Sequence, residues 1–146
     1  MKFSYRRLQL SGESPIFGPT LLKPIIPITL EVAERSLRYP ALIDSGADFC
    51  IFEAQLGEYL GLDVESGKPE YFGGIQERGG AVAYFHHVSL VVGGQRHNVY
   101  IGFSPDVAQY GYGILGQIGF FSLFMVKFNY EKETVELLER KVHKFA

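Results

Sequence analysis

Glycine and proline divide this chain into short apolar runs, and this division is the feature that most constrains its fold. The 146 residues include 17 glycines and 7 prolines, and the runs between them are rich in β-branched and aromatic side chains. Short runs of this kind, separated by turn-forming residues, are typical of the strands of a barrel or sandwich. The sequence therefore predicts an all-β protein with one or two short helices.

The predicted strands cover most of the chain. Gly93-Gly94 lies between two long strand-like runs and predicts a tight hairpin turn. Residues 11–19 and 104–112 are expected to be loops, and residues 119–124 are expected to form a helical turn. The predicted strands are residues 3–10, 25–32, 37–43, 49–52, 81–92, 95–103, 125–128 and 134–138.

The best helix candidate is residues 53–60, between two strand-like regions. Helical spacing places Leu56, Tyr59 and Leu60 on one face, and that face is predicted to pack on the core. Gly61 is expected to end the helix, because glycine readily adopts the left-handed conformation that follows a helix.

Length and composition bound the class of protein. A chain of 146 residues suits one domain, and no repeat or linker divides it, so a single domain over residues 1–146 is expected, with its core at about 24–130. The formal net charge of −2 gives no reason to expect nucleic acid or an anionic membrane as a partner.

The compartment is expected to be the reducing cytoplasm. Cys50 is the single cysteine, so an internal disulfide is impossible. Residues 1–7 carry charge but no apolar stretch follows, which argues against a signal peptide. No window reaches the roughly 18 apolar residues of a membrane span.

The candidate for chemistry is Asp44-Ser45-Gly46, which follows the apolar run Ala41-Leu42-Ile43 directly. Two such carboxylates held about 3 Å apart cannot both ionise, so they share one proton. The ionised partner can then take a proton from water while the protonated one polarises a peptide carbonyl. A hydroxyl at Ser45 can hydrogen-bond across the pair, and Gly46 lets a substrate backbone come close. The sequence holds this tripeptide once, so a site built from two such acids would need a second copy of the chain.

Two further segments, both after Asp44 in the chain, could complete a site around it. Gly113-Ile114-Leu115-Gly116, some seventy residues downstream, can form a strand that packs beneath the Asp44 loop. The glycine-rich residues 73–80 lie between strand-like runs and can form a mobile hairpin over a cleft. Residues considered as lining for that cleft are Phe49, Ile75, Val82 and Ile114, which would favour apolar substrates.

With these motifs in this order, the chain resembles the retropepsin-like aspartic proteases, and small bacterial members in particular. The resemblance spans about residues 24–130 and implies a closed barrel with one lobe per chain, acting as a homodimer on a peptide or protein substrate. It implies that Asp44 is catalytic and that Ser45 makes the hydrogen bond across the dimer. By the same resemblance, Gly46 and Asp48 bind the substrate backbone.

The resemblance also places Gly74 and Ile75 near the tip of a flap. One position departs from the retroviral pattern: Gln117 stands where an arginine follows the second glycine motif and pairs with the acid at the position of Asp48. The family needs no cofactor. His86 and His87 do not change the expectation of no metal, because neighbours on a strand face opposite sides.

Three classes of function remain open from the sequence. The leading one is a dimeric aspartic endopeptidase. The alternative is a catalytically silent retropepsin-like module that binds a peptide or a partner protein, because a fold does not fix a function. The third is an unrelated β domain in which Asp44-Ser45-Gly46 is an ordinary turn.

Overall fold

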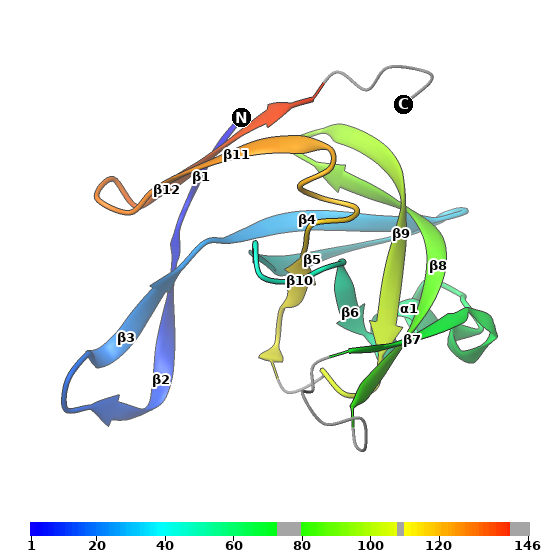
Figure 1. Cartoon of the computed structure of the whole chain (residues 1–146), viewed down its shortest axis with the longest axis horizontal. Coiled ribbons are helices and arrows are strands. Elements are labelled where there is room, and N and C mark those ends of the chain that lie inside the picture. The colour runs from blue at the N-terminus through cyan, green and yellow to red at the C-terminus, as the bar shows by residue number, and fades with distance from the viewer. Residues whose placement is uncertain (73–79, 108–109, 141–146) are drawn as a thin grey trace.

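The structure is a computed structural model of the chain, and it describes residues 1–72, 80–107 and 110–140. Twelve strands, one α-helix and one 3₁₀-helix make up this part (Figure 1). The N-terminal half contains β1 (Lys2–Ser4), β2 (Arg6–Ser14), β3 (Gly18–Lys23), β4 (Ile25–Val32), β5 (Arg35–Ile43), β6 (Ile51–Glu53), α1 (Ala54–Tyr59), η1 (Val64–Ser66) and β7 (Lys68–Phe72). The C-terminal half contains β8 (Ala81–Val92), β9 (Gln95–Ser104), β10 (Gly113–Leu115), β11 (Phe124–Asn129) and β12 (Thr134–Glu139).

Six strands form a hydrogen-bonded ring. Their order is β4-β5-β10-β6-β9-β8, and β8 pairs again with β4, for example at Thr29 and Val91. This last pairing closes the sheet, and β7 adds to β8 outside the ring. The prediction of a closed, all-β fold with one or two short helices is confirmed.

A second sheet of three strands joins the two ends of the chain. Its order is β1-β12-β11, and Figure 1 shows it lying across the ring. Phe3 of β1 pairs with Val135 of β12, and the N–H of Leu137 donates to the carbonyl of Met1. The N-terminal strand is therefore paired within its own chain.

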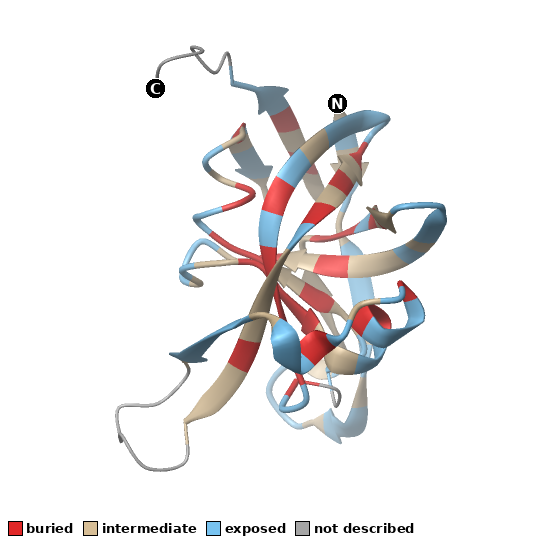
Figure 2. Ribbon diagram, turned by 90° about the vertical axis from the view of Figure 1, so that its right-hand side faces the viewer, coloured by how far each residue is buried: buried red, intermediate tan, exposed pale blue. Residues whose placement is uncertain are grey.

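The main core fills the ring with aliphatic and aromatic side chains. Leu30, Phe52, Leu90, Phe103 and Leu115 are each fully buried in this cluster. Figure 2 shows the buried positions gathered where the strands cross at the centre of the molecule. Four of them lie in predicted strands, and Leu115 lies in the predicted apolar pair Ile114-Leu115. Successive side chains of a strand point to opposite faces, so each strand places only some of its residues in the core.

The prediction that residues 11–19 form a loop is wrong for most of that segment. β2 continues to Ser14 and β3 begins at Gly18, so the two strands form a hairpin with a short turn. Residues 11–13 and 15–17 are exposed, so no buried face imposes an apolar alternation there. The strand predicted at residues 3–10 is also divided, because the N–H of Tyr5 turns away to donate to the carbonyl of Glu133.

The helix ends as its sequence predicts. Gly61 has φ +89°, its N–H donates to the carbonyl of Glu58, and the N–H of Leu62 donates to the carbonyl of Gly57. This pair of bonds is a Schellman motif, which satisfies the last carbonyls of the helix. The predicted face is correct for Leu56 and Leu60 but wrong for Tyr59, which is exposed.

The segment after β10 is a series of hydrogen-bonded turns. The N–H groups of Leu123 and Phe124 both donate to the carbonyl of Phe120, so the chain makes one helical turn. Phe120 and Phe124 are buried and anchor this turn in the core. The expected helical turn is present, although no helix forms.

Candidate active site

The loop that begins at Asp44 joins β5 to β6 across the end of β10. β10 lies between these two strands, parallel to β5 and antiparallel to β6. Leu115 pairs with Ile43, the residue before Asp44. The apolar pair predicted to support the loop therefore lies directly beneath it, in the register that the topology of the ring dictates.

Glycines at both ends of β10 allow close packing around it. A Cβ on Gly116 would lie 2.4 Å from the carbonyl oxygen of Phe49 and 2.7 Å from that of Ala47, so glycine is needed there for the close approach of the loop backbone. A Cβ on Gly113 would lie 2.2 Å from the ring of Phe52 on β6, so a larger residue there would displace that buried ring.

Asp44 is held by the backbone around it. Its N–H donates to the carbonyl of Leu115 at 2.9 Å, which fastens the loop to β10. Its Oδ1 accepts the N–H of Gly46 at 2.9 Å, and its carbonyl accepts the N–H of Ala47 at 3.1 Å. The aspartate thus makes a turn of its own, and this turn fixes the direction of its short side chain. Asp44 is partly buried, whereas Ser45 and Gly46 are exposed.

Gln117 connects the loop to the segment after β10. Its Nε2 donates to the carbonyl of Ser45 at 2.6 Å, and its N–H donates to the carbonyl of Ala47 at 2.8 Å. The N–H of Ile118 donates to the carbonyl of Asp48 at 2.9 Å. An amide at position 117 therefore holds the loop through its main chain, where the retroviral pattern has an arginine that pairs with a carboxylate.

Cys50 lies below the loop as a buried thiol. It is fully buried, its Sγ lies 3.4 Å from the N–H donor of Gly116, and burial raises the pKa of this thiol to about 12. A thiol in this state is neutral and unreactive. Cys50 acts as apolar packing beneath Gly116.

A pocket of about 280 Å³ adjoins the loop. Its floor belongs to a small apolar cluster, separate from the main core, in which Ile51 and Val107 are buried and Phe49 and Phe72 are packed against them. Such a concave, mainly apolar site next to polar loop atoms is typical of a ligand pocket. Its lining residues are 46–49 of the loop, Ile51, Phe72, Val107, Tyr110 and Ile114.

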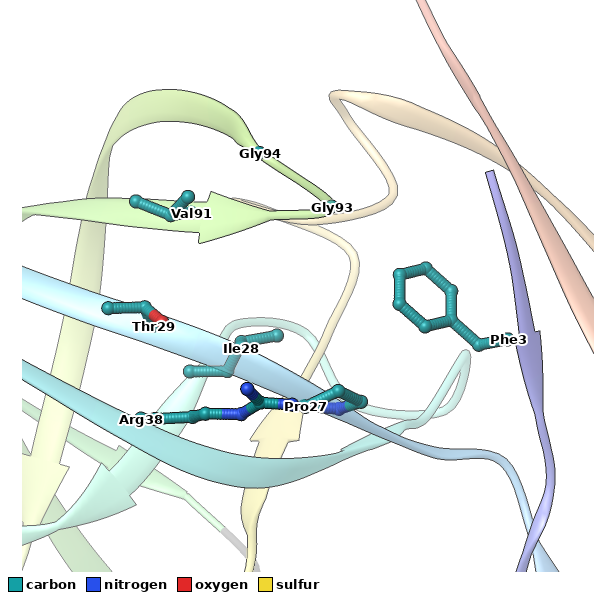
Figure 3. Close-up of a pocket in the computed structure, with 8 residues that line it drawn as sticks. All are labelled: Phe3, Pro27, Ile28, Thr29, Arg38, Val91, Gly93 and Gly94. Carbon is teal, nitrogen blue, oxygen red and sulfur yellow. The ribbon is translucent and has the colours of Figure 1, made fainter.

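Among the other pockets of the described residues, two have volumes close to or above that of the pocket beside the loop. One of about 360 Å³ begins on Phe49, which it shares with the pocket beside the loop, and is lined further by Lys68, Glu70, Phe85, Tyr100 and Ile118. The other, of about 270 Å³, is formed by Phe3, the turn Gly93-Gly94 and residues of β4, β5 and β8 (Figure 3). None of the residues predicted for catalysis or substrate binding lines this third pocket, and its charged lining residue is Arg38.

The structure brings together the predicted residues of the loop. Gly46 and Asp48 line one pocket with Phe49 and Ile114, two of the residues considered for an apolar cleft. Val82 does not line it; its N–H donates instead to Oδ2 of Asp106 at 3.1 Å. Gly74 and Ile75, predicted near the tip of a flap, lie outside the described residues.

The histidines considered as metal ligands have other contacts. Nε2 of His86 lies 2.8 Å from the carbonyl of Val64, and the ring of His87 lies 3.7 Å from that of Tyr100. Within residues 1–72, 80–107 and 110–140, no three His, Cys, Asp or Glu side chains gather closely enough to hold a metal ion. None of the helices in the same ranges is long and apolar enough to cross a membrane.

Sequence reasoning missed five residues that line the pocket, and it also missed the contact made by Gln117. Two of the five, Ala47 and Ile51, lie on the Asp44 loop or directly after it. Phe72, Val107 and Tyr110 reach the pocket from segments far from Asp44 in the sequence. Phe72 ends the strand before the glycine-rich segment, and this position beside an expected flap was the available signal. For Val107, Tyr110 and Gln117 no local pattern gives such a signal.

Solved structures of other proteins resemble this chain in fold. A retropepsin-like aspartic protease from Rickettsia conorii superimposes with a TM-score of 0.56 and 16% sequence identity, over 77% of this chain and 81% of that chain. The EIAV protease, solved with an inhibitor, gives a TM-score of 0.45 and 17% identity, over 65% of this chain and 82% of that chain. No protein-family model and no curated protein sequence matches the chain.

The chain therefore has a retropepsin-like fold. At 16% identity the similarity to the Rickettsia structure establishes the fold, and the activity has to be argued from the site.

Proposed function

We propose that this protein is an aspartic-type endopeptidase that acts as a homodimer, with Asp44 of each copy supplying one carboxyl group. One observation carries the proposal: Asp44 lies on a loop fixed from below by β10, with Ser45 and Gly46 exposed beside it. A loop so fixed and yet open at its outer side is suited to meet a second, identical loop. Each chain has one Asp-Ser-Gly tripeptide, so the second loop comes from a second copy.

The chemistry follows from the proximity of the two carboxyl groups. Like charges about 3 Å apart cannot both ionise, so the pair holds one proton between them. The ionised group takes a proton from a bound water, and that water attacks the scissile carbonyl while the protonated group polarises its oxygen. Ser45 would hydrogen-bond across the dimer and keep the two loops in register.

Substrate binding is proposed for the pocket beside the loop. Gly46 and Asp48 present polar loop atoms to it, and Phe49, Phe72 and Ile114 present apolar surface. We therefore expect a peptide whose side chains next to the scissile bond are apolar. Gly74 and Ile75 would cover this peptide as part of a flap. No cofactor is needed, because two carboxyl groups activate water without one.

Cleavage of a peptide library tests the proposal. The wild-type protein should cleave peptides at acidic to neutral pH, a statine-type inhibitor should block the cleavage, and Asp44→Asn should abolish it. Asp63→Asn is the matched control, because Asp63 is exposed and lies beside η1, away from the loop.

The same assay separates the alternatives. Unchanged cleavage by Asp44→Asn would remove Asp44 from the chemistry. A wild-type protein that dimerises and binds peptides without cleaving them would be the silent binding module.

A further inference from the structure

The hairpin of β2 and β3, here called the arm (residues 6–23), is not explained by the chemistry of the site. Its two strands pair with each other as a separate two-stranded sheet in the described structure. Figure 1 shows the arm projecting away from the ring of strands. A lone two-stranded hairpin is at best marginally stable in water, so the arm needs a surface on which to pack.

The tip of the arm presents two large apolar side chains to solvent. Ile16 is 80% exposed and Phe17 is 69% exposed. The Oγ of Ser14 accepts the N–H groups of Ile16 at 3.2 Å and Phe17 at 3.1 Å, and Gly18 completes the turn with φ +82°. The tip is therefore shaped by specific hydrogen bonds. Two large apolar side chains exposed side by side on a tip of fixed shape are suited to contact with another protein surface.

The base of the arm lies beside the catalytic loop. The carbonyl of Pro24, directly after β3, accepts the N–H of Ile43 at 3.0 Å, and Ile43 precedes Asp44. On the other strand, Arg7 forms an exposed ion pair with Glu133 at 3.1 Å. A second chain whose Asp44 meets this one must therefore lie next to the base of the arm.

We propose that the arm packs against the second copy of this chain, with Ile16 and Phe17 buried on the surface of that copy. This inference rests on the proposed function, because the incomplete site is what brings the second copy here. β2 has nine residues and spans roughly 30 Å at about 3.3 Å per residue. A chain of this size has a radius of gyration of about 15 Å, so the arm is long enough to cross much of its neighbour.

Two-fold symmetry doubles the effect of the contact. Each copy contributes one arm and one receiving surface, so the dimer buries two Ile16 and two Phe17 side chains. The free energy gained by burying four large apolar side chains is large compared with the difference in binding free energy between a tight dimer and a weak one. The arm is therefore expected to set the affinity of the dimer, while Asp44 sets its chemistry.

The test is sedimentation velocity on the double variant Ile16→Ser/Phe17→Ser. Its dimer dissociation constant should rise by at least about 100-fold, because four apolar side chains lose their burial. The matched control is Met125→Ser/Leu138→Ser, which removes a facing pair, 63% and 55% exposed, from the outer side of the three-stranded sheet. Circular dichroism should show both variants folded, and high protein concentration should restore cleavage by the arm variant.

The possible outcomes test the role of the arm separately from the proposed function of the Asp44 site. An unchanged dissociation constant for Ile16→Ser/Phe17→Ser, in a wild-type protein that dimerises and cleaves, would overturn the role of the arm and leave the proposed function intact. The same holds if only the Met125/Leu138 variant weakens the dimer. Loss of cleavage in Asp44→Asn with an unchanged dimer would support the proposed function separately. A wild-type protein that cleaves as a monomer would overturn both.

A second measurement follows the tip directly. Cys50 is fully buried, so Phe17→Cys adds an accessible thiol that an environment-sensitive dye can label. The emission of the dye should shift to the blue over the same concentration range in which the dimer forms. A constant emission across that range would contradict burial of the tip.

Discussion

The residues around Asp44 are fixed mainly by backbone groups. Asp44 accepts the N–H of Gly46 and donates to Leu115, and Gln117 donates to the carbonyl of Ser45. These contacts place a carboxyl group without another charged side chain, so the loop depends on glycine at its close approaches and on one amide.

Gln117→Ala should slow the reaction without unfolding the protein. The variant removes the Nε2 hydrogen bond to Ser45, worth about 1 kcal/mol. If the loop is positioned by that bond, kcat should fall roughly fivefold while KM changes little. Steady-state kinetics measures this split, and Gln55→Ala, an exposed glutamine on α1, is the matched control. A change in KM alone would contradict a positioning role.

Cys50 should resist alkylation in the folded protein. Burial raises the pKa of its thiol to about 12 from an ordinary value of 9.0, so at pH 8 the folded protein holds almost no thiolate. Iodoacetamide should label Cys50 in urea and not in buffer, as mass spectrometry can measure. Between pH 9 and 12 the unfolded state loses this proton first, so the thiol lowers the free energy of unfolding as pH rises. Equal labelling rates in both states would contradict the burial.

At the scale of elements, the site is made by the insertion of β10 between β5 and β6. β10 is short, yet it supports the Asp44 loop; it begins at Gly113, and Gly116 follows its last residue. Because the N–H of Asp44 donates to the carbonyl of Leu115, we expect a shift of β10 to move the carboxyl group.

Gly116→Ala should damage both stability and activity. The new Cβ would meet the carbonyl oxygens of Phe49 and Ala47, so the loop would have to shift. Overpacking of this kind costs roughly 1–3 kcal/mol of unfolding free energy, which urea denaturation measures. Gly12→Ala is the control, because nothing lies within 4 Å of its Cβ. Equal stability of the two variants would contradict the tight approach.

The sequence predicts structure best where a residue determines the conformation of its own backbone. The turn at Gly93-Gly94 and the helix end at Gly61 are confirmed, because each depends on a glycine that acts on its own backbone. The role of Asp44-Ser45-Gly46 stays a prediction. The arm was missed because a hairpin with two exposed sides shows no apolar alternation. The bond from Gln117 to Ser45 was missed because the two residues are 72 positions apart and meet through the register of β10.

At the scale of the whole molecule, one chain supplies half of the proposed site. The ring of strands is complete in a single copy, because β4 pairs with β8, and the terminal strands pair within the chain. A single copy is therefore a folded unit, and only the proposed chemistry would require association.

Dilution should lower the activity per chain. Below the dissociation constant of the dimer most chains are monomers, each with one Asp44, and specific activity should fall in proportion to the dimer fraction. Cleavage of a fluorogenic peptide over a range of enzyme concentrations measures this, with sedimentation velocity on the same samples. Activity per chain that stays constant while the dimer dissociates would contradict a shared site.

The distance between the two Asp44 carboxyl groups tests the central claim most directly. A crystal structure of the protein with a statine-type peptide inhibitor measures it. We predict a two-fold dimer in which these groups lie about 3 Å apart, with the inhibitor over them. Separation of the two groups by more than about 6 Å in every assembly, beyond the range at which they can share a proton, would contradict the account.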